Sequence, residues 1–184
     1  MPIVIVLGLI FGLSGGTGPG SAPTTASAPP SALPALTPTA PPSNPAAAAP
    51  CTKLLQTLPE RLGDLLPRVV HPRPDSLFVV AWGEPAVIVR CGVPRPADLK
   101  PGSADFVPVV NGVSFLEHDT SDAHVYVAID RAAYVEISFP KSSGSGELPL
   151  LATAIAKAMP PVCLPQAGVG EKQPDPADLC VNRP

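Results

Sequence analysis

The amino-acid sequence predicts an α+β domain: an antiparallel sheet of about six strands, with an N-terminal and a C-terminal helix packed on one face. Short segments rich in β-branched residues follow one another between turn signals, which indicates strands. Segments with apolar residues at helical spacing precede and follow these strands. The chain also contains four cysteines, which predict that disulfides brace the domain.

The distribution of charge divides the chain. No Asp, Glu, Lys or Arg occurs before Lys53, although the whole chain contains 12 basic and 15 acidic residues. We therefore expect that the globular part begins close to this point. The predicted organisation is a signal or short membrane anchor (1–13), a disordered tether rich in Pro, Ala, Ser and Thr (14–50), a globular extracytoplasmic domain (51–160) and a Pro-rich tail (161–184).

The N-terminal segment Ile3–Leu13 is apolar throughout. A membrane-spanning helix needs about 20 apolar residues, whereas the apolar core of a secretory signal needs about 7–15. Ala26-Ser27-Ala28 has the small-x-small form of a cleavage site, so cleavage and uncleaved anchoring both stay open. Either outcome predicts a protein that is secreted or anchored to the cell membrane. The following tether should be extended, because proline fixes φ and removes backbone donors.

Two helices are predicted at the ends of the domain. Leucines at helical spacing predict the first over Thr52 to about Leu66, with an interruption at Pro59. The second begins near Leu148, has Pro149 in its first turn and ends before Pro160.

The predicted strands are joined by short turns. Gly83-Glu84-Pro85 separates one pair, and Asn111-Gly112, a strong hairpin signal, separates another. Pro108 lacks an amide donor, which predicts that its strand lies at the edge of the sheet or contains a bulge. The predicted strands are Leu77–Trp82, Ala86–Cys91, Phe106–Val110, Val113–Glu117, His124–Ile129 and Tyr134–Phe139.

Alternation within the last two strands predicts one buried and one solvated face. We expect three apolar side chains of each strand to face the core, and the residues between them to face water. The inward residues are Val125, Val127 and Ile129 in one strand and Val135, Ile137 and Phe139 in the other; Tyr134, Glu136 and Ser138 point outward.

No two of the four cysteines form a Cys-x-x-Cys pair, which argues against a redox motif. Sequence alone allows three pairings, and we favour Cys51–Cys91 together with Cys163–Cys180. The alternative for Cys91 is a reactive thiol activated by the neighbouring Arg90.

Composition narrows the range of partners. The net charge of −3 and the isoelectric point near 5.5 leave no basic stripe for nucleic acid. No cofactor-binding or catalytic motif is present, so we expect no cofactor and assign no catalytic residue. The expected partners are a cell-envelope protein or glycan, with the membrane reached through the N-terminal segment.

One polar cluster could carry chemistry. A carboxylate and an imidazole in one loop can bind a divalent metal or transfer protons, although a solvated loop explains the same residues and is the interpretation we favour. Trp82 could line a ligand groove or pack the hairpin against a helix, and Arg90 with Arg95 could bind an anion or face water. The residues of the cluster are Glu117, His118, Asp119, Asp122 and His124.

Three segments, WGEPAVIVRCGVPRP, VNGVSFLEHD and YVEISFP, carry a resemblance to a known family. Over roughly Cys51 to Met159 the chain resembles small exported actinobacterial proteins of the domain of unknown function 3515 family. The resemblance implies an N-terminal signal or membrane segment and an extracytoplasmic domain, and it implies no activity.

The sequence therefore predicts a non-catalytic cell-envelope protein that binds another envelope component or acts as an accessory. The alternative is a small-ligand-binding or hydrolytic domain that uses the Glu117–His124 loop and Trp82. A pocket that joins this loop to Arg90 would favour the alternative.

Overall fold

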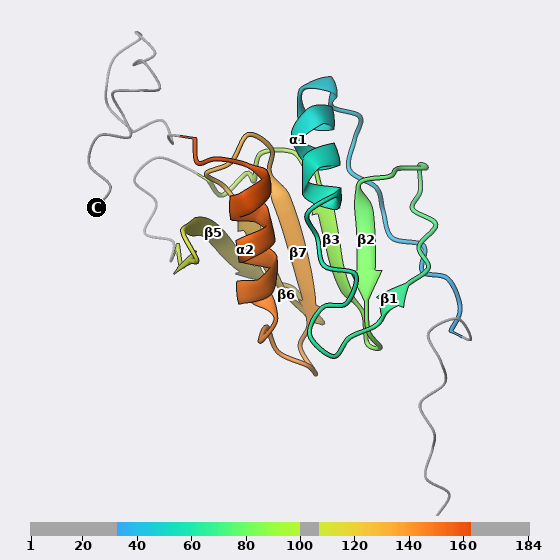
Figure 1. Ribbon diagram of the computed structural model, residues 1–184. Helices are drawn as coiled ribbons and strands as arrows, with labels where there is room; N and C mark the ends of the chain where they lie inside the picture. Colours follow the sequence, from blue (N-terminus) through green and yellow to red (C-terminus); the bar gives the residue numbers. More distant parts are fainter. Residues whose placement is uncertain (1–32, 100–106, 163–184) are drawn as a thin grey trace, which may run out of the picture.

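The computed structural model describes residues 33–99 and 107–162, which form two helices and a single sheet (Figure 1). Its strands are antiparallel neighbours in the order β1-β2-β3-β7-β6-β5-β4. The predicted α+β class is confirmed, with seven strands in place of about six. The elements are α1 (Pro45–Leu55), β1 (Pro67–Arg68), β2 (Val79–Trp82), β3 (Val87–Cys91), β4 (Val109–Val110), β5 (Val113–Asp119), β6 (Ala123–Ala128), β7 (Val135–Pro140) and α2 (Leu148–Ala158).

The additional strand is β1, which lies directly after the predicted end of the first helix near Leu66 and was not predicted. Pro67 and Arg68 pair with Trp82 and Ala81 of β2. Proline cannot donate to a ladder, so it is tolerated here because β1 lies at the edge of the sheet. The edge position predicted for the Pro108 segment is also consistent with the structure, since β4 is the opposite edge.

Helix α1 begins earlier and ends earlier than predicted. It runs over Pro45–Leu55, where Asn44 caps its first turn by accepting from the amide of Ala46. Pro45 is tolerated at the first helical position, because a backbone N–H there would have no partner within the helix. The following alanines favour helix. The predicted extension to about Leu66 is wrong. Pro59 lacks the backbone N–H that a helix interior needs, so the helix does not continue through this residue.

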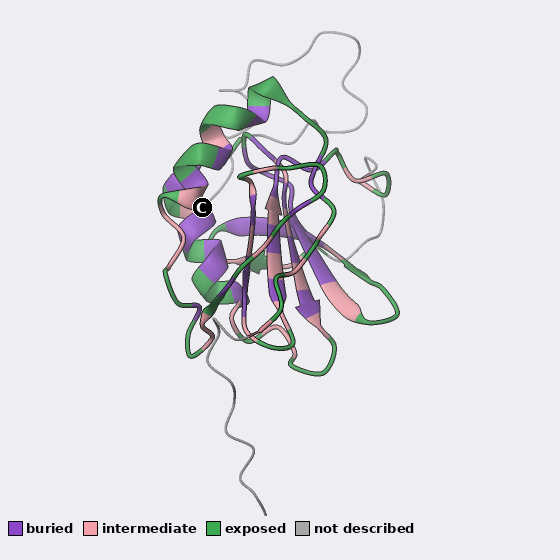
Figure 2. Cartoon of the chain, turned by 90° about the vertical axis from the view of Figure 1, so that its right-hand side faces the viewer, coloured by how far each residue is buried: buried purple, intermediate pink, exposed green. Residues whose placement is uncertain are grey.

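Both helices pack on the same face of the sheet, as predicted (Figure 1). Figure 2 shows that the buried residues of α1 and α2 lie on the sides turned towards the sheet. Leu54 of α1 and Leu151 of α2 are completely buried with Phe115, Ile137 and Phe139 of the strands. This main core places the inward residues of β7 as the alternation predicted.

The opposite face of the sheet is not the uniformly solvated surface that the sequence analysis expected. Val125 and Val127 of β6, together with Ile129, form a second buried cluster on this face. Val93 and Leu99, from the segment after β3, cover that cluster. Strand β6 is therefore buried on both faces, which the period-two pattern alone did not reveal.

The predicted bridge between Cys51 and Cys91 is present and joins α1 to the end of β3. Both cysteines are buried, with 0% and 1% of their surfaces exposed. Gly92 follows with a φ of +88°, and a Cβ atom at this position would lie 3.2 Å from the Cβ of Ala47. The close approach of α1 and the sheet therefore requires a glycine here. The predicted Cys163–Cys180 bridge lies outside the described residues.

Residues 34–40, which we call the N-terminal strap, are part of the fold although the sequence analysis placed them in the tether. The amide of Leu36 donates to Val69, and the amide of Ala40 donates to Arg73, at 2.9 and 3.1 Å. Two arginines also hold the strap: Arg68 donates to Pro34 at 2.9 Å, and Arg90 donates to Thr39 at 3.2 Å. The strap thus belongs to the fold although it precedes the predicted boundary at Cys51, because backbone hydrogen bonds compensate for its scarcity of large apolar side chains.

The Asn111-Gly112 turn joins β4 to β5, as predicted. Asn111 has a φ of 47° and Gly112 a φ of 77°, so both adopt the left-handed conformation that this hairpin requires. The Asn111 side chain also donates to Pro149 and Thr153 of α2, each at 2.9 Å. The turn therefore connects the edge of the sheet to the C-terminal helix.

Candidate functional site

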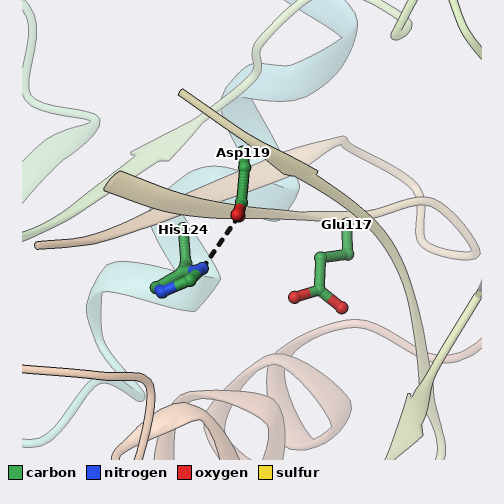
Figure 3. Close-up of side chains that lie close together, drawn as sticks. All are labelled: Glu117, Asp119 and His124. Carbon is green, nitrogen blue, oxygen red and sulfur yellow. Dashed lines mark hydrogen bonds and ion pairs between the residues drawn. The ribbon is translucent and has the colours of Figure 1, made fainter. Parts of the chain in front are cut away.

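Glu117, Asp119 and His124 come together at one end of the sheet (Figure 3). The antiparallel register pairs Asp119 with His124, and Glu117 with Tyr126, so these side chains share one face. Each of the three residues offers one ligand atom, and these atoms lie within 4.8 Å of one another. Phe115, two residues before Glu117, belongs to the main core, so the cluster continues the helix-covered face beyond that core.

Two neighbours contact the carboxylate of Asp119. His124 Nδ1 lies 2.8 Å from Asp119 Oδ1, and Lys141 Nζ lies 3.6 Å from Asp119 Oδ2. The hydrogen bond with His124 is the main cause that holds the pKa of Asp119 below its ordinary value of 3.8. These side chains are only partly covered, with 50% of Asp119 and 32% of His124 exposed. The cluster is therefore accessible to small solutes.

Tyr126 connects the cluster to the core. Its hydroxyl donates to Glu117 Oε1 at 2.9 Å and lies 3.2 Å from the hydroxyl of Ser145, in the loop before α2. Its ring makes edge-to-face contacts with Phe115 and Phe139. Burial raises the pKa of Tyr126 above 10.0. The neutral phenol therefore fixes the orientation of Glu117.

Two other members of the predicted loop do not join the cluster. His118 pairs with Val125 in the register, on the opposite face of the sheet, and is exposed. Asp122 accepts hydrogen bonds from Thr120 and Ser121 within its own turn, and these bonds lower its pKa. Only three of the five polar residues thus converge.

Trp82 and Arg90 lie away from the cluster. Trp82 is buried in the main core, and its indole nitrogen donates to the carbonyl of Glu60 at 3.3 Å. Arg90 forms an ion pair with Glu136 on the opposite face of the sheet. Arg95 donates to the hydroxyl of Tyr134 at 3.1 Å, so the two arginines contact different partners. The predicted candidates are therefore distributed over both faces.

Comparison with protein families decides the affiliation of the chain. The family described as "Protein of unknown function (DUF3515)" matches residues 1–163. The chain belongs to this family. The comparisons of this DUF3515 protein with curated proteins and with solved structures gave no significant match. The family match extends to the N-terminal apolar segment, whereas the resemblance found from sequence began at Cys51.

Among the described residues, two of the surface hollows of the DUF3515 domain are lined mainly by apolar residues. One, of about 450 Å³, lies where the start of α1 meets the segment before β2, and Asn44, Leu77 and Phe78 line it. Leu77 is 83% exposed beside this hollow. The other, of about 360 Å³, includes Trp82 and Leu58 in its wall. Both are lined largely by apolar side chains, which favours contact with another apolar surface over polar catalysis.

Sequence reasoning missed three residues around the cluster of the DUF3515 domain. Tyr126, Lys141 and Ser145 all contact a cluster residue or one another, yet they lie up to 28 positions from Glu117 in the sequence. Alternation along β6 places Tyr126 on the same face as His124, so this partner was accessible to pattern analysis. Lys141 and Ser145 lie in a loop whose path depends on tertiary packing.

Proposed function

We propose that this DUF3515 protein is exported and acts outside the cytoplasm as a disulfide-braced, non-catalytic accessory domain that binds a cell-envelope protein. The bridge between Cys51 and Cys91 carries the proposal. Structural disulfides form and persist in oxidising compartments and are rare where thiols are kept reduced. The apolar run Ile3–Leu13 in the sequence supplies a segment of suitable length for a secretory signal. Among the described residues, no helix is long and apolar enough to cross a membrane.

The arrangement of the candidate residues supports binding over catalysis. Trp82 packs in the main core, and Arg90 lies on the face of the sheet opposite to this core. Asp119, at the end of β5, pairs with His124, at the start of β6. The His124 ring contacts Asp119, as the base of a catalytic triad contacts its orienting carboxylate. The nearby hydroxyl of Ser145, however, contacts Tyr126. The imidazole of His124 and the hydroxyl of Ser145 therefore contact different partners, and not each other as in a triad.

The hollow beside Leu77 supports a protein partner. Its wall is built mainly from prolines and apolar side chains, and Leu77 in this wall exposes 83% of its surface. Exposed apolar groups beside a concave surface are typical of protein-binding sites. A glycan would instead need several polar groups and a flat aromatic platform.

A reporter fusion tests the proposed location. Alkaline phosphatase, which needs its own disulfides, is fused after Val162 in two forms, with the complete N-terminus and with residues 2–13 deleted. We expect phosphatase activity only from the complete form, with both fusions present at equal amounts. Activity that is absent from both forms, or equal in both, contradicts export through this segment.

Crosslinking tests the proposed binding role. A photoreactive residue in place of Leu77 is compared with one in place of Glu147, which lies in the loop before α2. We expect one envelope protein to be crosslinked from position 77 and not from position 147. A crosslinked glycan, or the same pattern from both positions, contradicts a protein-binding hollow.

The alternative is a small-ligand-binding or hydrolytic domain that uses the Glu117–His124 loop. The 2.8 Å contact between His124 and Asp119 is the observation that favours it. Hydrolysis of model esters or glycosides that is lost in His124→Ala and retained in His118→Ala would favour this alternative over the binding role.

A further inference from the structure

We propose that Glu117, Asp119 and His124 form a binding site for a first-row divalent transition metal, of which Zn²⁺ is the representative ion. The site combines two carboxylates with one imidazole. Calcium and magnesium sites are built almost entirely from oxygen ligands, whereas an imidazole nitrogen with carboxylate oxygens suits zinc, iron, manganese or nickel. The proposal does not depend on the envelope-binding role, because the cluster lies apart from the hollow beside Leu77.

The geometry requires only small movements. Metal bonds to imidazole nitrogen and carboxylate oxygen are about 2.0–2.2 Å long, so ligands on one ion lie roughly 3–4 Å apart. The ligand atoms of the cluster are already within 4.8 Å of one another. Asp119 and His124 are partly exposed and can adjust their side-chain rotamers without disturbing the core. All three residues also lie on the paired strands β5 and β6, which hold their backbones in register.

The neighbours of the cluster prepare it for a cation. Tyr126 donates to one oxygen of Glu117 and so orients the carboxylate. Residues that hydrogen-bond to the ligands of metal sites have the same effect. His124 Nδ1 and Asp119 Oδ1 lie 2.8 Å apart and share a hydrogen bond. A metal ion could replace the proton of this bond after only a slight increase in the distance between the two atoms. The carboxylate of Asp119 already attracts one cation, since Lys141 lies 3.6 Å from it.

Lys141 provides the discriminating prediction. Its ammonium group competes with a metal for Asp119, because two positive charges near one carboxylate repel each other. Removing this charge should therefore strengthen binding of a divalent ion, on the order of tenfold at low ionic strength for a charge about 6 Å away in water. If the cluster were only an ion-pair network, this substitution would leave metal binding unchanged.

Calorimetric titration of the full chain with Zn²⁺, in a buffer that does not chelate metals, tests the proposal. We expect one ion per chain, with affinity at least tenfold lower in His124→Ala and in Glu117→Gln. His118→Ala is the matched control. His118 lies on β5, as Glu117 does, but it is exposed on the opposite face of the sheet. Lys141→Met should bind more tightly than the wild type.

Nuclear magnetic resonance of the wild-type imidazoles gives a second test that needs no substitution. The ring signals of His124 should shift on addition of Zn²⁺, whereas those of His118 and His71 should stay unchanged. Absence of binding heat, equal losses in His124→Ala and His118→Ala, or ring shifts at His118 in place of His124 would each overturn the proposal.

Discussion

Reduction of the Cys51–Cys91 bridge should destabilise the domain substantially. The bridge joins two buried residues, one on α1 and one at the end of β3, across a sequence separation of 40. The same face carries the main core, so loss of the link affects the packing of α1 against the sheet. Reduction is a cleaner perturbation than substitution, because it leaves both sulfur atoms in place and creates no large cavity.

The expected magnitude follows from the closed loop. For 40 residues, the chain-entropy relation gives about 4 kcal/mol at 25 °C, which is a large share of the 5–15 kcal/mol that stabilises a typical domain. In a domain of this size, each kcal/mol corresponds to about 4 °C in melting temperature. We therefore expect the Tm to fall by about 15 °C on reduction.

Urea denaturation with and without a strong reductant measures this loss. A Cys163→Ser/Cys180→Ser variant is used, so that the reductant acts on one pair alone, and a thiol assay verifies complete reduction. The free energy of unfolding should decrease by about 4 kcal/mol. A decrease below about 1 kcal/mol, with both thiols titrated, would refute the reasoning that the bridge stabilises this fold.

Three further predictions concern single positions. Gly92→Ala should destabilise the domain by about 2 kcal/mol in urea denaturation, because Gly92 has a φ of +88° and its new Cβ would lie 3.2 Å from Ala47 Cβ; an unchanged midpoint would contradict this. Asn111→Ala should cost about 1–2 kcal/mol, since it removes a left-handed asparagine and two hydrogen bonds to α2, whereas Asn44→Asp, which retains a helix cap, should cost much less. The pKa of Tyr126 is raised by burial, so its contribution to stability is complete below pH 10.0 and is lost as the pH rises through the folded-state value; Tyr126→Phe should show a smaller alkaline loss, and parallel curves for both proteins would contradict it.

Local signals in the sequence predicted much of the fold. Asn111-Gly112 specified a hairpin by itself, because few other residue pairs adopt two consecutive left-handed conformations easily. The apolar spacing around Leu151 predicted α2 together with its buried face. The predicted pairing of Cys51 with Cys91 was also correct.

The errors arose where distant contacts decide the structure. Composition predicted an extended tether up to Pro50, yet a capping Asn44 and an alanine run start α1 inside it. The strap depends on hydrogen bonds to residues more than 30 positions away, which no local pattern encodes. Likewise, Asp130 and Arg131 lie between two predicted strands, and no local pattern predicts that both are buried and lie 3.1 Å apart as an ion pair.

The candidate site shows the same division. Strand alternation could place Asp119 and His124 on one face once their hairpin was assumed, and it could also exclude His118. It could not predict that Lys141 and Ser145, from the loop before α2, would approach the same region. Loop paths depend on the packing of the elements that they join.

Peptide mapping of unreduced protein, isolated from the cells that produce it, tests whether the domain is oxidised at Cys51 and Cys91 and exported. Free thiols are blocked at lysis, the protein is digested, and the peptides are analysed by mass spectrometry before and after reduction. We expect the peptide that contains Cys51 to be linked to the peptide that contains Cys91, in the extracytoplasmic fraction. Recovery of both cysteines as blocked thiols from cytoplasmic material would contradict the oxidised, exported domain described above.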